Sequence, residues 1–148
     1  MSIGEKIDSD FKEAFIKKDD LRVSVLRLIK NSIHNQEIAK KKKKLSNEEI
    51  QKIIFFEAKK HKDSIAAFQK GGRDDLLAKE KKELEIIEQY LPKQLETQEI
   101  KKIVQEIIDS ASDEEKNFGQ MMKQVMAKIR GQADGKIISQ IVKELLSS

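Results

Sequence analysis

The chain has 148 residues, of which 38% are hydrophobic and 38% charged, and it contains no cysteine. The lack of cysteine excludes disulfides, thiolate metal sites and thiol nucleophiles. No apolar stretch approaches the ~20 residues of a membrane span, and the first residues lack a signal-peptide core. Apolar residues recur at regular intervals, which is untypical of a disordered chain. We therefore expect a soluble, cytoplasmic protein without membrane contacts, built as one domain or two small ones.

The excess positive charge lies in the first half of the chain. Lysine and arginine number 30 against 26 aspartates and glutamates, a net charge of +4, and residues 1–70 hold 17 basic and 11 acidic residues. Five of these basic residues are consecutive, namely Lys40, Lys41, Lys42, Lys43 and Lys44. On a helix, five consecutive residues encircle the axis and cannot form one binding face, whereas a frayed end would make a basic loop. Two interpretations stay open: a solvated helix end, and a contact with a polyanion.

Apolar residues spaced three and four apart predict helices along the whole chain, and no segment has the period of two that is typical of a strand. The first helix is expected over residues 3–18. Asp19 or Asp20 then caps a second helix, which begins at Leu21 and runs into the lysines.

Capping signals delimit the next two helices. Ser46 and Glu49 form a capping box that opens the third helix, and the pair Gly71-Gly72 ends it. Asp74 or Asp75 starts a fourth helix, which continues through Leu91. Pro92 cannot continue a helix interior, so a boundary is expected there.

Three shorter helices are expected after Pro92, over residues 97–110, 118–130 and 135–146. Gly131 is placed to end the sixth helix, and Asp134 to cap the seventh. The change in helix length predicts an all-α fold of about seven helices in two subdomains, residues 1–92 and 93–148. The second is expected to be a small three-helix bundle with a marginal core.

Few residues suggest chemistry. His34 and His61 each stand alone on a predicted helix, whereas a metal site needs convergent ligands, so we expect no metal and no cofactor. The sequence contains no nucleophile elbow, Walker loop or glycine-rich turn after a strand. Paired carboxylates are abundant, but most of them precede or open predicted helices, where capping explains them.

Three methionines gather on the sixth predicted helix, at Met121, Met122 and Met126. Methionines in such a stripe usually fill a core. A flexible docking surface for a partner protein is the alternative.

Several runs of the sequence, in order, resemble one known family. Leu26-Arg27-Leu28-Ile29-Lys30 comes first, and residues 73–95 contain the run Tyr90-Leu91-Pro92-Lys93-Gln94-Leu95. Later come Phe118-Gly119-Gln120-Met121-Met122 and Arg130-Gly131-Gln132-Ala133-Asp134-Gly135. Together they resemble the GatB/YqeY family over almost the whole chain. The resemblance implies a free-standing YqeY-like protein with an all-α fold in two subdomains.

Such proteins are similar to the tail domain of the GatB subunit of the tRNA-dependent amidotransferase, which amidates Glu-tRNA(Gln) or Asp-tRNA(Asn) with ammonia from glutamine. In that enzyme the tail holds tRNA, while the glutaminase and kinase chemistry belongs to other domains. The resemblance therefore implies tRNA and amidotransferase subunits as partners, and it brings no active site.

The positions that match the family motifs are Tyr90, Leu91, Pro92, Gly119, Met122, Arg130, Gly131, Asp134 and Gly135. Most of them look structural. Pro92 is expected to fix the turn between the subdomains, and Gly119 to let two helices approach closely. Gly131 with Asp134-Gly135 is expected to form the last turn between helices.

That last turn also predicts a phosphate contact, because backbone N–H groups there would lie beside Lys128, Arg130 and Lys136. Gln132 stands where the family leads us to expect a lysine, which weakens this interpretation. Lys123 replaces a common glycine. Glu96 replaces a serine-type cap, which leaves Thr97 as the expected cap of the fifth helix.

Three functions are therefore considered. The leading hypothesis is a tRNA-associated helical protein, accessory to glutamine-dependent tRNA amidation and without its own active site. The second is an adaptor that docks an amidotransferase or another partner. The third is carbon–nitrogen ligase activity with glutamine as amide donor, a label that the resemblance carries but that no catalytic motif in the sequence supports.

Overall fold

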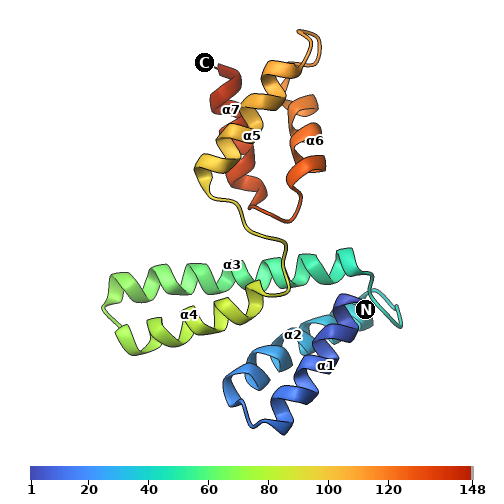
Figure 1. Cartoon of the computed structure of the whole chain (residues 1–148), viewed down its shortest axis with the longest axis vertical. Helices are drawn as coiled ribbons and strands as arrows, with labels where there is room; N and C mark the ends of the chain where they lie inside the picture. Colours follow the sequence, from blue (N-terminus) through green and yellow to red (C-terminus); the bar gives the residue numbers. More distant parts are fainter. Residues whose placement is uncertain (148) are drawn as a thin grey trace. The chain divides into compact units, whose positions relative to one another are not determined.

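A computed structural model describes residues 1–147, and within them the chain forms seven α-helices and no strand (Figure 1). The all-α prediction is confirmed. The helices are α1 (Ile3–Ile16), α2 (Asp20–Ala39), α3 (Asn47–Gly71), α4 (Asp74–Glu88), α5 (Thr97–Ser110), α6 (Phe118–Ile129) and α7 (Gly135–Ser147). None of these described helices combines the length and apolar character that a membrane span requires.

Side-chain caps set the limits of α2 and α3 as the sequence predicts. The Asp19 carboxylate accepts a hydrogen bond from the backbone N–H of Arg22 at 3.3 Å. The Ser46 hydroxyl accepts from the Glu49 N–H at 3.2 Å, and the Glu49 carboxylate accepts from the Ser46 N–H at 3.1 Å. Gly72 ends α3 with φ +66, a left-handed conformation that glycine adopts without strain.

Two predicted helix ends and one predicted cap are wrong. Helix α1 ends at Ile16, before the predicted residue 18. Helix α4 ends at Glu88, before the predicted Leu91, because the N–H groups of Tyr90 and Leu91 bond carbonyls only three residues back in a tightened last turn. Thr97 is the first residue of α5, not its cap. Glu96 holds the capping position in an extended conformation and makes no side-chain hydrogen bond there.

The chain forms two compact units, which we call unit 1 (Met1–Leu91) and unit 2 (Pro92–Ser148). In unit 1, α3 and α4 lie side by side as an antiparallel hairpin, and α1 and α2 pack against them (Figure 1). Leu45 follows the lysine run and is buried in this core, so it anchors the loop that carries the lysines. The buried core residues of unit 1 are Ile7, Val25, Leu26, Ile29, Leu45, Ile50, Ile54, Ala58, Ile87 and Tyr90.

Tyr90 ties the end of α4 to the first two helices of unit 1. Its hydroxyl donates to the Asp10 carboxylate at 2.6 Å and accepts from the Arg22 guanidinium at 3.2 Å. Arg22 also donates to the Gln89 side chain at 3.0 Å. Burial, together with the bond to Asp10, raises the pKa of the Tyr90 hydroxyl, which therefore stays protonated as a donor.

Unit 2 is a three-helix bundle of α5, α6 and α7 around its own apolar core. Met121 is completely buried in this core, and Met122 and Met126 are partly buried against it. The methionines therefore serve mainly as core, which leaves little of the stripe for docking. The buried core residues of unit 2 are Ile100, Val104, Ile108, Met121, Val125, Ile129, Ile138, Ile141 and Val142.

Gly119 does not mediate a close approach of helices, so the role predicted for it is wrong. A Cβ atom built there would meet only the Asn117 side-chain oxygen, at 3.6 Å, an ordinary van der Waals contact. Asn117 is the cap of α6, and its side chain accepts from the Gln120 N–H at 3.0 Å. Position 119 lies in the first turn of α6, where a glycine is not required by packing.

Candidate nucleic-acid interface

Two segments that carry family motifs meet at one end of unit 2. We call residues 92–96 the strap and residues 130–134 the turn. The Leu95 N–H donates to the Gln132 carbonyl at 2.9 Å. The Gln94 side chain donates to the carbonyls of both Pro92 (2.8 Å) and Gly131 (2.9 Å). These bonds hold two non-helical segments, far apart in sequence, in one fixed arrangement.

Gln132, which departs from the expected lysine, has a structural role in this junction. Its side chain donates to the Lys93 carbonyl at 3.1 Å, while its backbone carbonyl accepts from Leu95. The side chain therefore turns toward the strap. A phosphate contact at this position would have to come from neighbouring residues.

Gly131 is required at its position by the backbone. Its φ of +79 lies in the left-handed region, whereas the space around it is sufficient, because an added methyl group would have Pro92 Cγ as its nearest neighbour at 3.7 Å. Replacing Gly131 by Ala is therefore expected to cost about 1–2 kcal/mol through backbone strain alone. Urea unfolding of the two proteins measures this difference.

The matched control is Gly135→Ala. Gly135 begins α7, and apart from its chain neighbours and the backbone of its own helix nothing lies within 4 Å of the position of an added Cβ. This variant should be neutral or gain up to about 1 kcal/mol of helix propensity. Equal destabilisation of both variants would contradict the argument from the turn geometry.

Four exposed cationic side chains surround the strap and the turn. Lys128 lies in the last turn of α6, Arg130 caps that helix, Lys136 lies at the start of α7, and Lys93 belongs to the strap. Sequence reasoning missed Lys93, because only the strap hydrogen bonds bring it to the turn. The Asp134 carboxylate accepts from the Lys136 N–H at 2.9 Å, as the cap predicted for α7 should.

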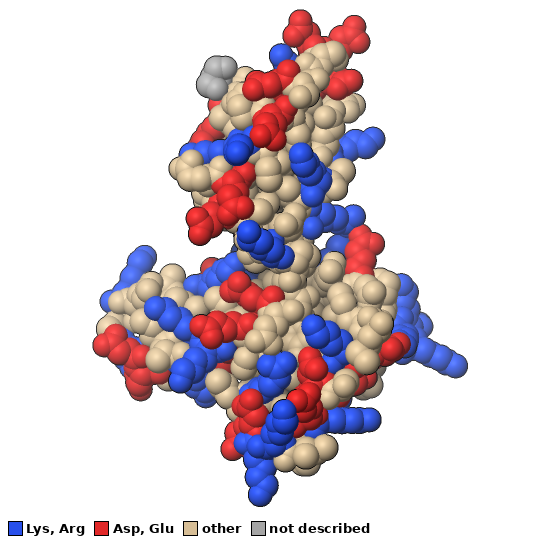
Figure 2. Space-filling view, in the orientation of Figure 1, with Lys and Arg blue, Asp and Glu red and all other residues tan. Residues whose placement is uncertain are grey.

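Charge is distributed unevenly along unit 2. Asp113, Glu114 and Glu115 lie in the connection between α5 and α6, at the end of α6 opposite the turn. The helix between these two ends has 12 residues and is therefore about 18 Å long. Figure 2 shows acidic side chains gathered over the α5–α6 connection. The end of unit 2 that carries the strap and the turn is therefore basic. We call this region, with Lys93, Lys128, Arg130 and Lys136, the basic end.

The lysine run of unit 1 forms the loop between α2 and α3. Lys40 is the C-cap of α2, and Lys41 has a left-handed φ of 54, so the chain leaves the helix there and the lysines do not encircle it. The ammonium groups of Lys40 and Lys42 lie 2.8 and 3.0 Å from the Glu49 carboxylate. Lys44 lies 3.7 Å from Glu5.

Glu49 neutralises part of this lysine loop. Its hydrogen bond to Lys40, followed by those to the Ser46 backbone and Lys42, holds its pKa well below the ordinary range. With Lys44 beside Glu5, three of the five lysines therefore already have a carboxylate partner. Among the described residues, no ion pair involves Lys41 or Lys43.

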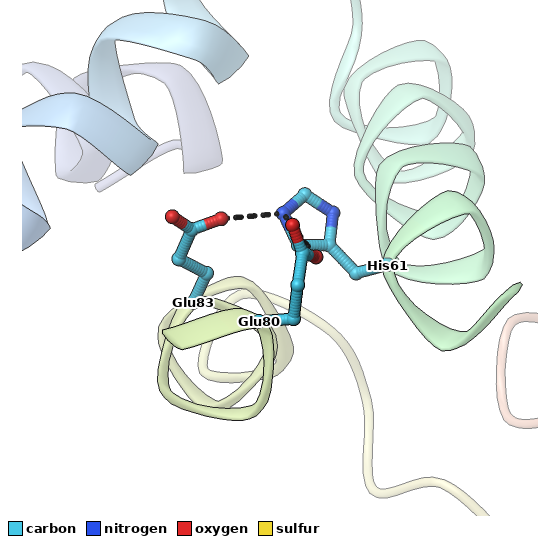
Figure 3. A group of neighbouring side chains, drawn as sticks. All are labelled: His61, Glu80 and Glu83. Atoms are coloured by element: carbon cyan, nitrogen blue, oxygen red, sulfur yellow. Dashed lines mark hydrogen bonds and ion pairs between the residues drawn. The ribbon is translucent and has the colours of Figure 1, made fainter. Parts of the chain in front are cut away.

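A further polar cluster lies between α3 and α4. The sequence suggests that His61 stands alone, but in the structure it has two acidic neighbours. Glu80 and Glu83 project toward its ring from α4 (Figure 3). Glu80 and Glu83 are three residues apart and share one helix face. That spacing is visible in the sequence, but the pairing with His61 depends on the α3–α4 hairpin.

The chain belongs to the YqeY-like family. The family's sequence profile, described as "Yqey-like protein", matches residues 4–146, which confirms the resemblance seen in the motifs. The chain is also similar to proteins named "Altered inheritance of mitochondria protein 41, mitochondrial". Identities are 33% over 126 residues in Kluyveromyces lactis, 38% over 85 residues in Lachancea thermotolerans and 30% over 125 residues in Saccharomyces cerevisiae strain YJM789.

These matches cover different shares of the two proteins. They span 83%, 57% and 80% of this chain, and 66%, 46% and 68% of the three relatives in the same order. The relatives are named as mitochondrial proteins. On this comparison, the expected cytoplasmic location is wrong. The lack of a long apolar stretch argued against a membrane span, but it carried no information on the cellular compartment.

Proposed function

We propose that this protein is a helical tRNA-binding protein that contacts the phosphate backbone through the basic end of unit 2. The observation that carries the proposal is the gathering of Lys93, Lys128, Arg130 and Lys136 around a strap and turn held by side-chain and backbone hydrogen bonds. The family resemblance adds tRNA as the nucleic acid. On this proposal the protein is accessory to glutamine-dependent tRNA amidation, with no active site of its own.

Phosphate binding suits the chemistry of the basic end. Lysine ammonium groups act as point charges for phosphate oxygens. Such contacts position a protein on RNA without reading its sequence. Aromatic residues make up only 5% of the chain, so stacking on exposed bases is not the expected mode.

Labelled tRNA binding at several salt concentrations tests the proposal. Each neutralised phosphate lowers the logarithm of affinity by about 0.7–0.9 per decade of salt. With three or four contacts, affinity should fall roughly 20–150-fold between ~50 and ~200 mM salt. Fluorescence anisotropy measures this directly. The absence of binding at ~50 mM salt would exclude direct tRNA recognition.

The two competing functions make different demands. An adaptor that docks through α6 needs exposed methionines, and Met121 is buried while Met122 and Met126 are half-buried. A carbon–nitrogen ligase would amidate charged tRNA in a purified assay without other subunits. Formation of amidated tRNA by this chain alone would overturn the non-catalytic role.

A further inference from the structure

We infer that His61, Glu80 and Glu83 bind a divalent transition-metal ion that joins α3 to α4. This site lies within unit 1 and does not depend on the proposed tRNA contact. One imidazole nitrogen and two carboxylate oxygens converge on it from facing helices (Figure 3).

The distances between the three side chains suit a common cation. His61 Nε2 lies 3.0 Å from Glu83 Oε2 and 3.7 Å from Glu80 Oε2. All three ligand atoms lie within 4.8 Å of one another. Nitrogen and oxygen ligands at about 2.0–2.2 Å from a zinc ion are roughly 3.3–3.6 Å apart in a tetrahedral arrangement. Small side-chain rotations are enough to close the coordination sphere.

The His61 ring is oriented as a metal ligand. Nδ1 lies 2.9 Å from the Glu57 carbonyl, which can only accept, so Nδ1 carries the donated hydrogen. In the neutral ring, Nε2 then presents a lone pair to the Glu83 carboxylate, which is also an acceptor. Either a proton on Nε2 or a cation between Nε2 and the carboxylates removes this conflict. Histidine ligands in metal sites commonly donate their other N–H to a backbone carbonyl in this way.

The two carboxylates lack another partner for their charge. Glu80 and Glu83 are largely shielded, with side chains 24% and 15% exposed. Across residues 1–147, neither forms an ion pair with a lysine or arginine. Two carboxylates this close repel each other when both are ionised, and a divalent ion removes that repulsion.

The donor set selects the kind of ion. A mixed imidazole and carboxylate site favours zinc and its first-row neighbours over magnesium or calcium, which prefer oxygen ligands alone. Three protein ligands leave at least one position for water or an external ligand. Because α3 and α4 each contribute, the ion would stabilise their hairpin by binding the folded chain preferentially.

Titration calorimetry of the full chain with zinc chloride tests the site. We expect saturable binding of one ion, a higher midpoint of thermal unfolding, and little response to magnesium. His61→Gln and Glu83→Gln should each weaken zinc binding by more than the 10–100-fold that loss of a supporting group costs. Glu85→Gln, at an exposed position on α4, removes the same charge and should leave binding unchanged.

His34 provides the second control, because it is exposed and lies 3.8 Å from Glu37, where zinc could bind at the surface. His34→Asn should leave the stoichiometry unchanged. Nitrogen NMR of the His61 ring tests the site in the unmodified chain, so that misfolding of a variant cannot affect the result. Zinc should coordinate Nε2 while Nδ1 keeps its hydrogen. A ring protonated on both nitrogens at saturating zinc, binding lost in the His34 variant, or no saturable binding would each overturn the site.

Discussion

Replacing Ile138 by Ala is expected to unfold unit 2 under conditions in which unit 1 stays folded. Ile138 is completely buried at the centre of the three-helix core. Truncation of a buried isoleucine to alanine costs about 2–5 kcal/mol, and a unit of this size is stable by only about 3–8 kcal/mol. The thermal midpoint of unit 2 should fall by about 10 °C or more.

Hydrogen exchange resolved along the chain is the appropriate measurement, because it reports the two units separately. Ile137→Ala is the matched control: the same substitution at the preceding residue of α7, where the side chain is 41% exposed. This control should change stability by less than about 1 kcal/mol. Similar losses in the two variants, or simultaneous loss of protection in unit 1, would contradict two units with separate cores.

Tyr90→Phe is expected to weaken unit 1 without changing its shape. The substitution removes a hydroxyl that donates to Asp10 at 2.6 Å and accepts from Arg22 at 3.2 Å, while the buried ring stays. A hydrogen bond to a charged group contributes about 1.5–3 kcal/mol, and Asp10 would lose its phenol partner. Denaturant unfolding should therefore show a loss of about 1.5–3 kcal/mol.

A double-mutant cycle with Asp10→Asn separates this bond from general packing. The coupling between the two sites should be at least about 0.5 kcal/mol, the level expected of residues in contact. Asp8→Asn, on the same helix, is the control, because the Asp8 side chain is 60% exposed and pairs with Lys30 at the surface. Coupling of Tyr90 to Asp8 as large as that to Asp10 would show that the hydroxyl bond is not the cause.

The helices could be predicted from the sequence because their limits depend on nearby residues. Ser46 and Glu49 are three residues apart and cap α3 through their own hydrogen bonds. Gly72 and Gly131 both occupy left-handed positions that end helices. The predicted helix end at Leu91 and the predicted cap at Thr97 failed, and both positions flank the strap, where hydrogen bonds to the distant turn hold the backbone.

The candidate sites were harder to predict because they depend on contacts between distant segments. Lys93 joins the basic end through strap bonds to a turn about 40 residues later. His61 meets Glu80 and Glu83 only when α3 and α4 fold back at Gly72. The pairing of His61 with Glu80 and Glu83 could have been predicted from the sequence, because the three residues are similar numbers of residues away from the predicted helix break at Gly71-Gly72. The pairing of the lysines with Glu49 required the loop conformation itself.

The most direct test of the proposed function compares three double variants, each of which removes two positive charges, in tRNA binding across a salt series. Lys128→Gln with Lys136→Gln alters the basic end, and Lys116→Gln with Lys143→Gln alters unit 2 elsewhere. Lys41→Gln with Lys43→Gln alters the lysine loop.

We predict that only the variant of the basic end weakens binding strongly and lowers the salt slope, by about 1.4–1.8. Equal losses in all three variants, or a loss confined to the lysine loop, would contradict a tRNA contact at the basic end of unit 2.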